Sequence, residues 1–126
     1  MEINDYQKKA MTTCMPTSNN IVYMSLNLSG EVGELCSKLA KAVRKGKLHI
    51  NTEPLNDDGD RLHIHDLNVS EEELNDIKKE CGDVMWQLAG VCTVLGFSLD
   101  DVCQQNLDKL AGRKNRGVID GNGDNR

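Results

Sequence analysis

The chain has 126 residues, 28% of them charged, and a formal net charge of −5 at pH 7. This length predicts a single domain, residues 1–126, with enough chain to bury a hydrophobic core. The acidic balance argues against a nucleic-acid polymer as the main partner, because phosphate backbones are bound by basic surfaces.

The cysteines and the amino terminus indicate a cellular compartment. The five cysteines form no CxxC pair, which argues against a zinc site and a disulfide framework. We expect Cys36, Cys81 and Cys92 to be small buried hydrophobic residues in a reducing cytoplasm. The first ten residues are too polar for a signal peptide, and no apolar run reaches the length of a membrane span. A cytoplasmic protein without a membrane partner is predicted.

Capping residues and apolar periodicity predict four helices, at residues 2–14, 20–44, 71–96 and 98–114. Gly46 and Gly96 close the second and third helices. Ser70 and Glu73 have the spacing of a capping box at the start of the third helix, and Ser98 caps the fourth. The predicted fold is an all-α antiparallel bundle.

Two segments do not follow this pattern. Residues 47–69 contain the turn-rich PLNDDGD between two short apolar stretches, which indicates either a short β-hairpin or a plain loop between the second and third helices. Residues 115–126 are glycine-rich and form an irregular tail. We interpret the first segment as an excursion from the bundle rather than a second domain.

The two long helices each carry an apolar stripe and a pair of carboxylates. Glu31 lies roughly 70° and Glu34 roughly 130° from the centre of the first stripe at 100° per residue. Glu80 and Asp83 have about the same offsets, in the same sense, on the third helix. Equal offsets reach the same flank only if the helices are antiparallel, so the four carboxylates are predicted to converge. The stripe residues are Ile21, Met24, Leu28, Val32, Leu35, Leu39 and Val43, facing Leu74, Ile77, Cys81, Val84, Met85, Leu88, Val91, Cys92 and Leu95.

Four converging carboxylates require cations, because like charges in a partly dry site repel. Hard divalent ions with oxygen ligands, Mg²⁺ above all, suit such a site. Either carboxylate pair alone is typical of a solvated helix face. The matched geometry of the two pairs favours a metal site.

These motifs, with Asn106-x-x-Lys109-Leu-x-x-Arg113 and the terminal Gly-Asp-Asn-Arg, resemble the MazG-type nucleoside triphosphate pyrophosphohydrolases, an all-α family. The resemblance implies that water cleaves a nucleoside triphosphate between the α- and β-phosphates, which gives a nucleoside monophosphate and pyrophosphate. It also implies that Mg²⁺, with Mn²⁺ as a possible substitute, is held by four carboxylates: Glu31, Glu34, Glu80 and Asp83.

The resemblance extends to further residues and to assembly. Gly30 stands where the family often has a glutamate, so we assign the orientation of the attacking water to Glu34. Lys109, Arg113 and Lys38 are candidates for the phosphate tail, although Arg113 could instead complement the helix dipole. Asn106 could contact the sugar or base, or only a backbone carbonyl. The family forms dimers or dimers of dimers, so a homodimer or homotetramer is predicted.

Two other classes fit parts of the pattern. A di-iron carboxylate bundle normally needs Glu-x-x-His on two helices, and no histidine follows any of the four carboxylates by three residues. A non-catalytic, metal-binding helical module that serves oligomerisation or regulation remains the alternative function.

Overall fold

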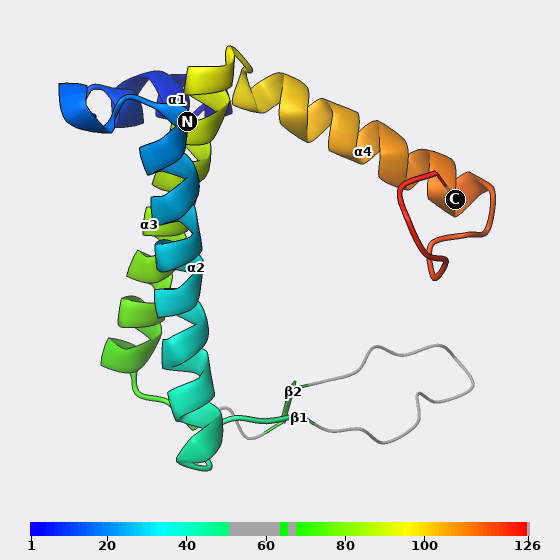
Figure 1. The fold of residues 1–126 in the computed structure, drawn as a ribbon. Coiled ribbons are helices and arrows are strands. Elements are labelled where there is room, and N and C mark those ends of the chain that lie inside the picture. The colour runs from blue at the N-terminus through cyan, green and yellow to red at the C-terminus, as the bar shows by residue number, and fades with distance from the viewer. Residues whose placement is uncertain (51–63, 66–67, 126) are drawn as a thin grey trace. The chain divides into compact units, whose positions relative to one another are not determined.

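The computed structural model describes residues 1–50, 64–65 and 68–125. In these residues the chain forms four α-helices, which confirms the predicted all-α class (Figure 1). The elements are α1 (Ile3–Met11), the 3₁₀ helix η1 (Pro16–Ser18), α2 (Ile21–Arg44), β1 (His49–Ile50), β2 (Ile64–His65), α3 (Glu71–Leu95) and α4 (Leu99–Asn115).

The first helix is shorter than the predicted range 2–14, because it ends at Met11. The hydroxyls of Thr12 and Thr13 donate to the carbonyls of Lys9 and Ala10, at 2.6 and 2.7 Å. Such local side-chain bonds compete with continued helical pairing. The other three helices begin and end within two residues of their predicted bounds.

The ends of the long helices follow the predicted caps. Gly46 and Gly96 have φ of 68° and 78°, the left-handed conformation that glycine adopts without a Cβ penalty. The amide after each glycine donates back to a helix carbonyl five residues earlier, which completes a Schellman-type ending. At the opposite end of α3, the Glu73 amide donates to Ser70 Oγ at 3.1 Å, as the capping box predicts.

The segment between α2 and α3 contains a two-residue antiparallel pair. In the β1–β2 pairing His49 is opposite His65 and Ile50 is opposite Ile64. Residues 51–63 and 66–67 of the predicted 47–69 excursion lie outside the described residues.

The chain divides into two compact units, which are described separately. The terminal unit comprises Met1–Met24 and Leu88–Arg126, and the central unit comprises Ser25–Gln87. Both α2 and α3 contribute to each unit.

An apolar core lies in the terminal unit. Ala89 and Cys92 of α3 and Leu99 of α4 are buried together, and residues of α1 pack against them. Met24 has no exposed surface, and a Cβ at Gly90 would overlap its side chain. The close approach of Met24 therefore requires glycine at position 90.

Buried Gln7 ties α1 to the turn between α3 and α4. Its Nε2 donates to Thr93 Oγ1 at 3.0 Å and to the Phe97 carbonyl at 2.9 Å. Its Oε1 accepts from the Leu99 amide at 2.8 Å. One amide side chain thus satisfies groups at the end of α3 and the start of α4, where helices leave backbone groups unpaired.

The central unit is built on an antiparallel pair of helix segments from α2 and α3. Three contacts between side chains fix the direction: Asn27 with Gln87, Lys38 with Glu80, and Lys47 with Glu73. In these three pairs, the residue number on α3 falls as the residue number rises along α2 and the turn that follows it. The antiparallel arrangement is the one that the carboxylate geometry requires.

Several residues of the predicted stripes stay largely exposed. Val32, Leu39 and Val43 on α2 are 41%, 37% and 55% exposed. The expectation that Cys36 and Cys81 are buried is wrong: both are exposed, and of the five cysteines, all free, Cys92 alone is buried. The buried residues Met24 and Ala42 lie roughly 50° from the centre of the α2 stripe, on the side of Glu31, so the stripe itself is turned partly toward solvent.

Within the described residues, no single helix is long and apolar enough to cross a membrane. Taken together, α3 and α4 pass that test as a bent pair by length and composition only.

Candidate functional site

Three carboxylates meet in the central unit. Glu31 of α2 and Glu80 and Asp83 of α3 each offer one oxygen, and these oxygens lie within 4.8 Å of one another. Glu80 is buried, Glu31 is half-buried and Asp83 is exposed. We call these three residues the carboxylate group.

The two carboxylate oxygens of Glu80 have different surroundings. Oε1 lies 3.1 Å from Lys38 Nζ. Oε2 is buried and has no hydrogen-bond partner among the residues that the structure describes. A buried carboxylate oxygen without a partner is costly, so this atom marks a place where a cation would be stabilised.

The Lys38–Glu80 contact shifts the pKa of the lysine. The hydrogen bond to Glu80 raises the pKa of Lys38 above 10.5, and nearby Asp76 and Glu34 add to the effect. A raised folded-state pKa stabilises the fold below the ordinary lysine pKa, and this contribution is lost only as the pH rises through the raised value. Lys38 is therefore charged throughout the neutral range.

A neutral amide orients the glutamate of α2. Asn27 lies one turn before Glu31 and donates from Nδ2 to Glu31 Oε1 at 3.1 Å. The same Nδ2 donates to Oε1 of Gln87, a residue only 1% exposed, at 2.8 Å. Glu31 is thus held toward α3 by a polar network that crosses between the helices.

The donor set fits a hard divalent cation. It consists of carboxylate oxygens alone, the ligand type that Mg²⁺ and Mn²⁺ prefer over nitrogen or sulfur. It includes the unpartnered Glu80 Oε2, and its exposed member, Asp83, leaves one side open to solvent. An open side is needed if a substrate oxygen is to join the coordination.

Glu34, the fourth predicted ligand, is exposed and does not belong to the group of three. Its angle from the apolar stripe, roughly 130°, is the larger of the two on α2. Its role as a ligand and as the residue that orients water stays a prediction.

The cations predicted on α4 lie in the terminal unit and contact the tail. Arg113 is only 5% exposed, and its Nη2 donates to Asp124 Oδ1 at 2.9 Å and to the Gly123 carbonyl at 3.2 Å. Lys109 Nζ lies 3.4 Å from the same Asp124 oxygen. The Arg113 guanidinium, and then Lys109, hold the pKa of Asp124 below its usual 3.8.

The remaining polar groups of this helix differ in their environment. Asn106 is exposed. Arg113 Nε is buried, and no group in the described part of the chain forms a hydrogen bond with it. Of the predicted residues of α4, Asn106 is thus exposed, whereas Lys109 and the buried Arg113 share the Asp124 carboxylate.

Sequence reasoning missed three residues. Asn27 and Gln87 lie four residues before Glu31 and four after Asp83, so their helical spacing carried a usable signal. Asp124 belongs to the terminal Gly-Asp-Asn-Arg of the resemblance, but its contact with Arg113 was not foreseen, because it depends on how the tail folds back.

Fold and site together define an all-α protein with a candidate divalent-metal centre between antiparallel helix segments. Comparison with known families agrees: the MazG nucleotide pyrophosphohydrolase domain matches residues 21–118. The chain belongs to this family, which implies nucleotide pyrophosphohydrolase activity.

A phage protein is similar over the whole length. The chain is 33% identical to the Gene 37 protein of Mycobacterium phage L5 over 133 aligned residues, which cover 100% of both proteins. No solved structure matches the chain.

Proposed function

We propose that this protein hydrolyses ribo- or deoxynucleoside triphosphates to nucleoside monophosphate and pyrophosphate in a Mg²⁺-dependent reaction. The observation that carries the proposal is the carboxylate group, in which Glu80 Oε2 is buried without a partner. Membership of the MazG family supports the reaction type.

The carboxylates have distinct tasks in this proposal. Glu31, Glu80 and Asp83 would hold Mg²⁺, with Mn²⁺ as a substitute, and Glu34 would be the fourth ligand. The bound ion would neutralise phosphoryl oxygens and lower the pKa of a water molecule. Glu34, which is exposed, would orient the attacking water in line with the scissile bond.

Cationic side chains would hold the phosphate tail. Lys38 is charged at neutral pH and contacts Glu80, so it would lie beside any phosphate bound at the carboxylate group. Lys109 and Arg113 are also proposed as phosphate ligands, and a phosphate would replace the Asp124 carboxylate that they now share. Asn106 is proposed to contact the sugar or base.

The assembly proposed is a homodimer or homotetramer of single-domain chains. Apolar side chains exposed on α2 and α4 support it: Val32, Val43, Leu107 and Leu110 are 41%, 55%, 60% and 41% exposed. Large apolar side chains exposed on one face of a helix commonly mark a protein interface. The cytoplasmic location stays a prediction from composition.

The test is a pyrophosphate-release screen across the ribo- and deoxynucleoside triphosphates, with Mg²⁺, with Mn²⁺ and with a chelator. We expect metal-dependent release of pyrophosphate, and not of orthophosphate, from at least one nucleotide. Release that survives chelation would contradict the proposal. Thermal stabilisation by Mg²⁺ without turnover of any nucleotide would favour the non-catalytic module instead.

A further inference from the structure

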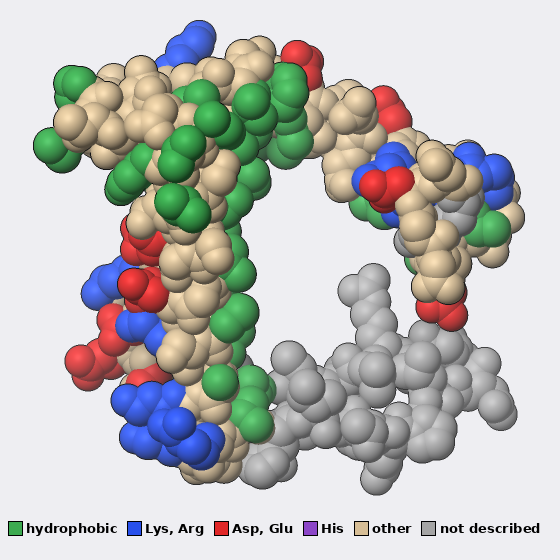
Figure 2. Space-filling view, in the orientation of Figure 1, with side chains coloured by type: hydrophobic (Ala, Val, Ile, Leu, Met, Phe, Trp, Pro, Cys, Tyr) green, Lys and Arg blue, Asp and Glu red, His purple; other side chains and the backbone are tan. Residues whose placement is uncertain are grey.

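A second charged feature lies on the same helix pair of the central unit. On α2, Glu31 and Glu34 are followed at helical spacing by Lys38, Lys41 and Lys45, so the face that begins acidic continues basic. Figure 2 shows Lys and Arg side chains gathered where α2 ends, with Asp and Glu side chains on the same face.

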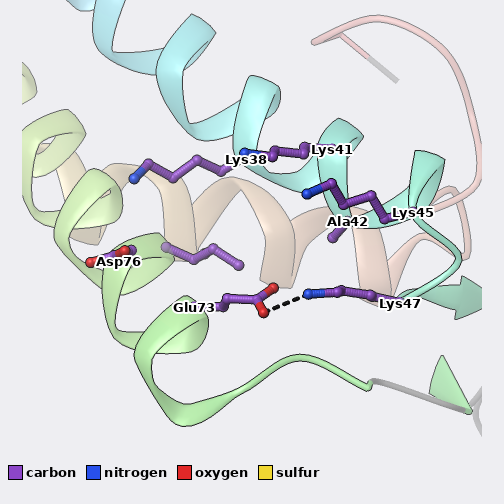
Figure 3. Close-up of a pocket in the computed structure, with 8 residues that line it drawn as sticks. Lys38, Lys41, Ala42, Lys45, Lys47, Glu73 and Asp76 are labelled. Carbon is purple, nitrogen blue, oxygen red and sulfur yellow. Dashed lines mark hydrogen bonds and ion pairs between the residues drawn. The ribbon is translucent and has the colours of Figure 1, made fainter.

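These lysines surround a cavity of about 310 Å³. Its lining residues are Lys38, Lys41, Ala42, Lys45, Lys47, Glu73, Asp76 and Ile77. In Figure 3 lysines from α2 extend on one side, and Glu73 and Asp76 of α3 lie on the other. We call this space the lysine cavity.

The charges of the lysine cavity do not balance. Lys38 is paired with Glu80 outside it, and Lys47 is paired with Glu73 at 2.6 Å. Asp76 is engaged by Lys79, 3.2 Å away, which does not line the cavity. Lys41 and Lys45 have no ion pair within the described residues, so two ammonium groups with three donors each remain for an anion.

The neighbouring contact indicates which anion. Lys38 lines the cavity and also touches Glu80 of the carboxylate group, so the two features share a side chain. Lys41 lies three residues beyond Lys38, about 4.5 Å along the helix axis. A chain of phosphates that starts at the carboxylate group would therefore enter the lysine cavity within about one helical turn.

We infer that the lysine cavity binds a pyrophosphate-type oxyanion through Lys41 and Lys45, supported by Lys38 and Lys47. Ammonium groups bind phosphate oxygens as compact point charges, and a cluster of them suits the high charge density of a diphosphate. The anion could be the β,γ-diphosphate of a bound nucleotide or the pyrophosphate released from it. This assignment of a source rests on the proposed function, whereas the binding itself does not.

The binding test uses inorganic pyrophosphate and the full chain in the presence of a chelator, so that neither metal nor turnover is needed. Calorimetry should show saturable binding of pyrophosphate by the original chain. The double variant Lys41→Gln/Lys45→Gln should bind about 100-fold more weakly, since each lost lysine costs about tenfold in affinity. The matched control, Lys8→Gln/Lys9→Gln, removes two exposed lysines of α1 and should bind as the original chain does. Equal binding by the Lys41/Lys45 variant, or no saturable binding by the original chain, would overturn the inference.

A variant that should bind pyrophosphate more tightly excludes misfolding as the cause of a change in affinity. Asp76→Asn removes a negative charge from the cavity wall and should tighten pyrophosphate binding about two- to tenfold, because a like charge no longer faces the anion. Weaker or unchanged binding by this variant contradicts the assignment of the cavity.

Kinetics distinguish the two sources of the anion. If the lysines hold the diphosphate of the substrate, the Lys41/Lys45 variant raises KM for the nucleotide; if they hold the product, KM is unchanged and inhibition by pyrophosphate weakens. Failure of the proposed function would be recognised separately, as pyrophosphate binding that depends on Lys41 and Lys45 in a protein that turns over no nucleotide.

Discussion

The two units of this protein use the same two long helices for different purposes. In the terminal unit α2 and α3 contribute apolar residues to a core, and Met24, Ala89 and Cys92 are buried there. In the central unit the described buried residues are Ala42, Glu80 and Gln87, two of them polar. Gln7 and Arg113 are also buried in the terminal unit, where most of the buried apolar residues lie. Because burial of apolar area is the main source of stability, the terminal unit contributes more of the stabilising core, and the central unit contributes the carboxylates.

This division has a physical cause. A carboxylate group that is to bind a cation must stay partly solvated, because full burial of unpaired charges costs several kcal/mol per ion. A core must exclude water. A core and a cation-binding carboxylate cluster at the same turns of a helix pair would require the same space to be both dry and solvated. Here different stretches of α2 and α3 provide the two environments.

The largest effect that tests the division is on activity. Glu80→Gln should lower pyrophosphate release by roughly 100-fold or more, since it removes a charged ligand of the ion that would neutralise the phosphoryl oxygens. The melting temperature without metal should stay the same or rise, because one of three crowded negative charges is gone. Steady-state kinetics and a thermal melt measure the two quantities on one preparation.

Glu34→Gln is the comparison for that variant. If Glu34 is the fourth ligand and orients water, the Glu34→Gln substitution should also lower activity, by about tenfold or more. Unchanged activity in Glu34→Gln would remove Glu34 from the site. Full activity in Glu80→Gln would end the assignment of the carboxylate group.

A smaller effect is expected from the amide that orients Glu31. Asn27→Ala should weaken Mg²⁺ binding by about 10- to 100-fold, the usual effect of losing a residue that orients a metal ligand. Titration calorimetry with Mg²⁺ measures it. Asn75→Ala, at an exposed asparagine of α3, is the matched control and should bind Mg²⁺ normally; equal affinities for both variants would contradict the role of Asn27.

The next variant should change stability and leave chemistry alone. Gly90→Ala places a Cβ against the fully buried Met24 side chain and should cost a net 1–2 kcal/mol or so, overpacking outweighing the gain in helix propensity. Gly33→Ala, with no atom within 4 Å of its added Cβ, should be neutral or stabilise by up to about 1 kcal/mol. Chemical denaturation compares them.

The outcome for Gly90→Ala also bears on the two units. Its activity per folded molecule should match that of the original chain. A fall in activity larger than the fall in folded fraction would show that the core and the carboxylate group are coupled, and would break the division.

The smallest effect concerns the tail. Because Arg113 and Lys109 lower the pKa of Asp124, their contacts stabilise the tail above the ordinary aspartate pKa and are lost as the pH falls through the lowered value. Lys109→Gln should move the Asp124 pKa back toward 3.8, and Lys114→Gln should not. An NMR titration of the carboxyl carbon measures this shift, and identical pKa values in both variants would contradict the Lys109 contact.

Local signals in the sequence determined the helices and much of the candidate site. Ser70 and Ser98 mark helix starts and Gly46 and Gly96 mark helix ends, because capping bonds join residues close in sequence. The helical angles of Glu31, Glu80 and Asp83 were enough to predict their convergence, since an antiparallel pair brings equal offsets to one flank. The early end of α1 was missed because apolar periodicity does not show that Thr12 and Thr13 bond to the backbone carbonyls of the last turn.

The tertiary structure alone decided what depends on distance and burial. It left Glu34 outside the carboxylate group, exposed Cys36 and Cys81, folded Asp124 onto Arg113 and gave Lys41 and Lys45 no ion pair among the described residues. Periodicity gives only the direction in which a side chain leaves its helix. Which groups touch also depends on the separation of the helices and on how the tail folds back, and contacts between residues distant in sequence set both.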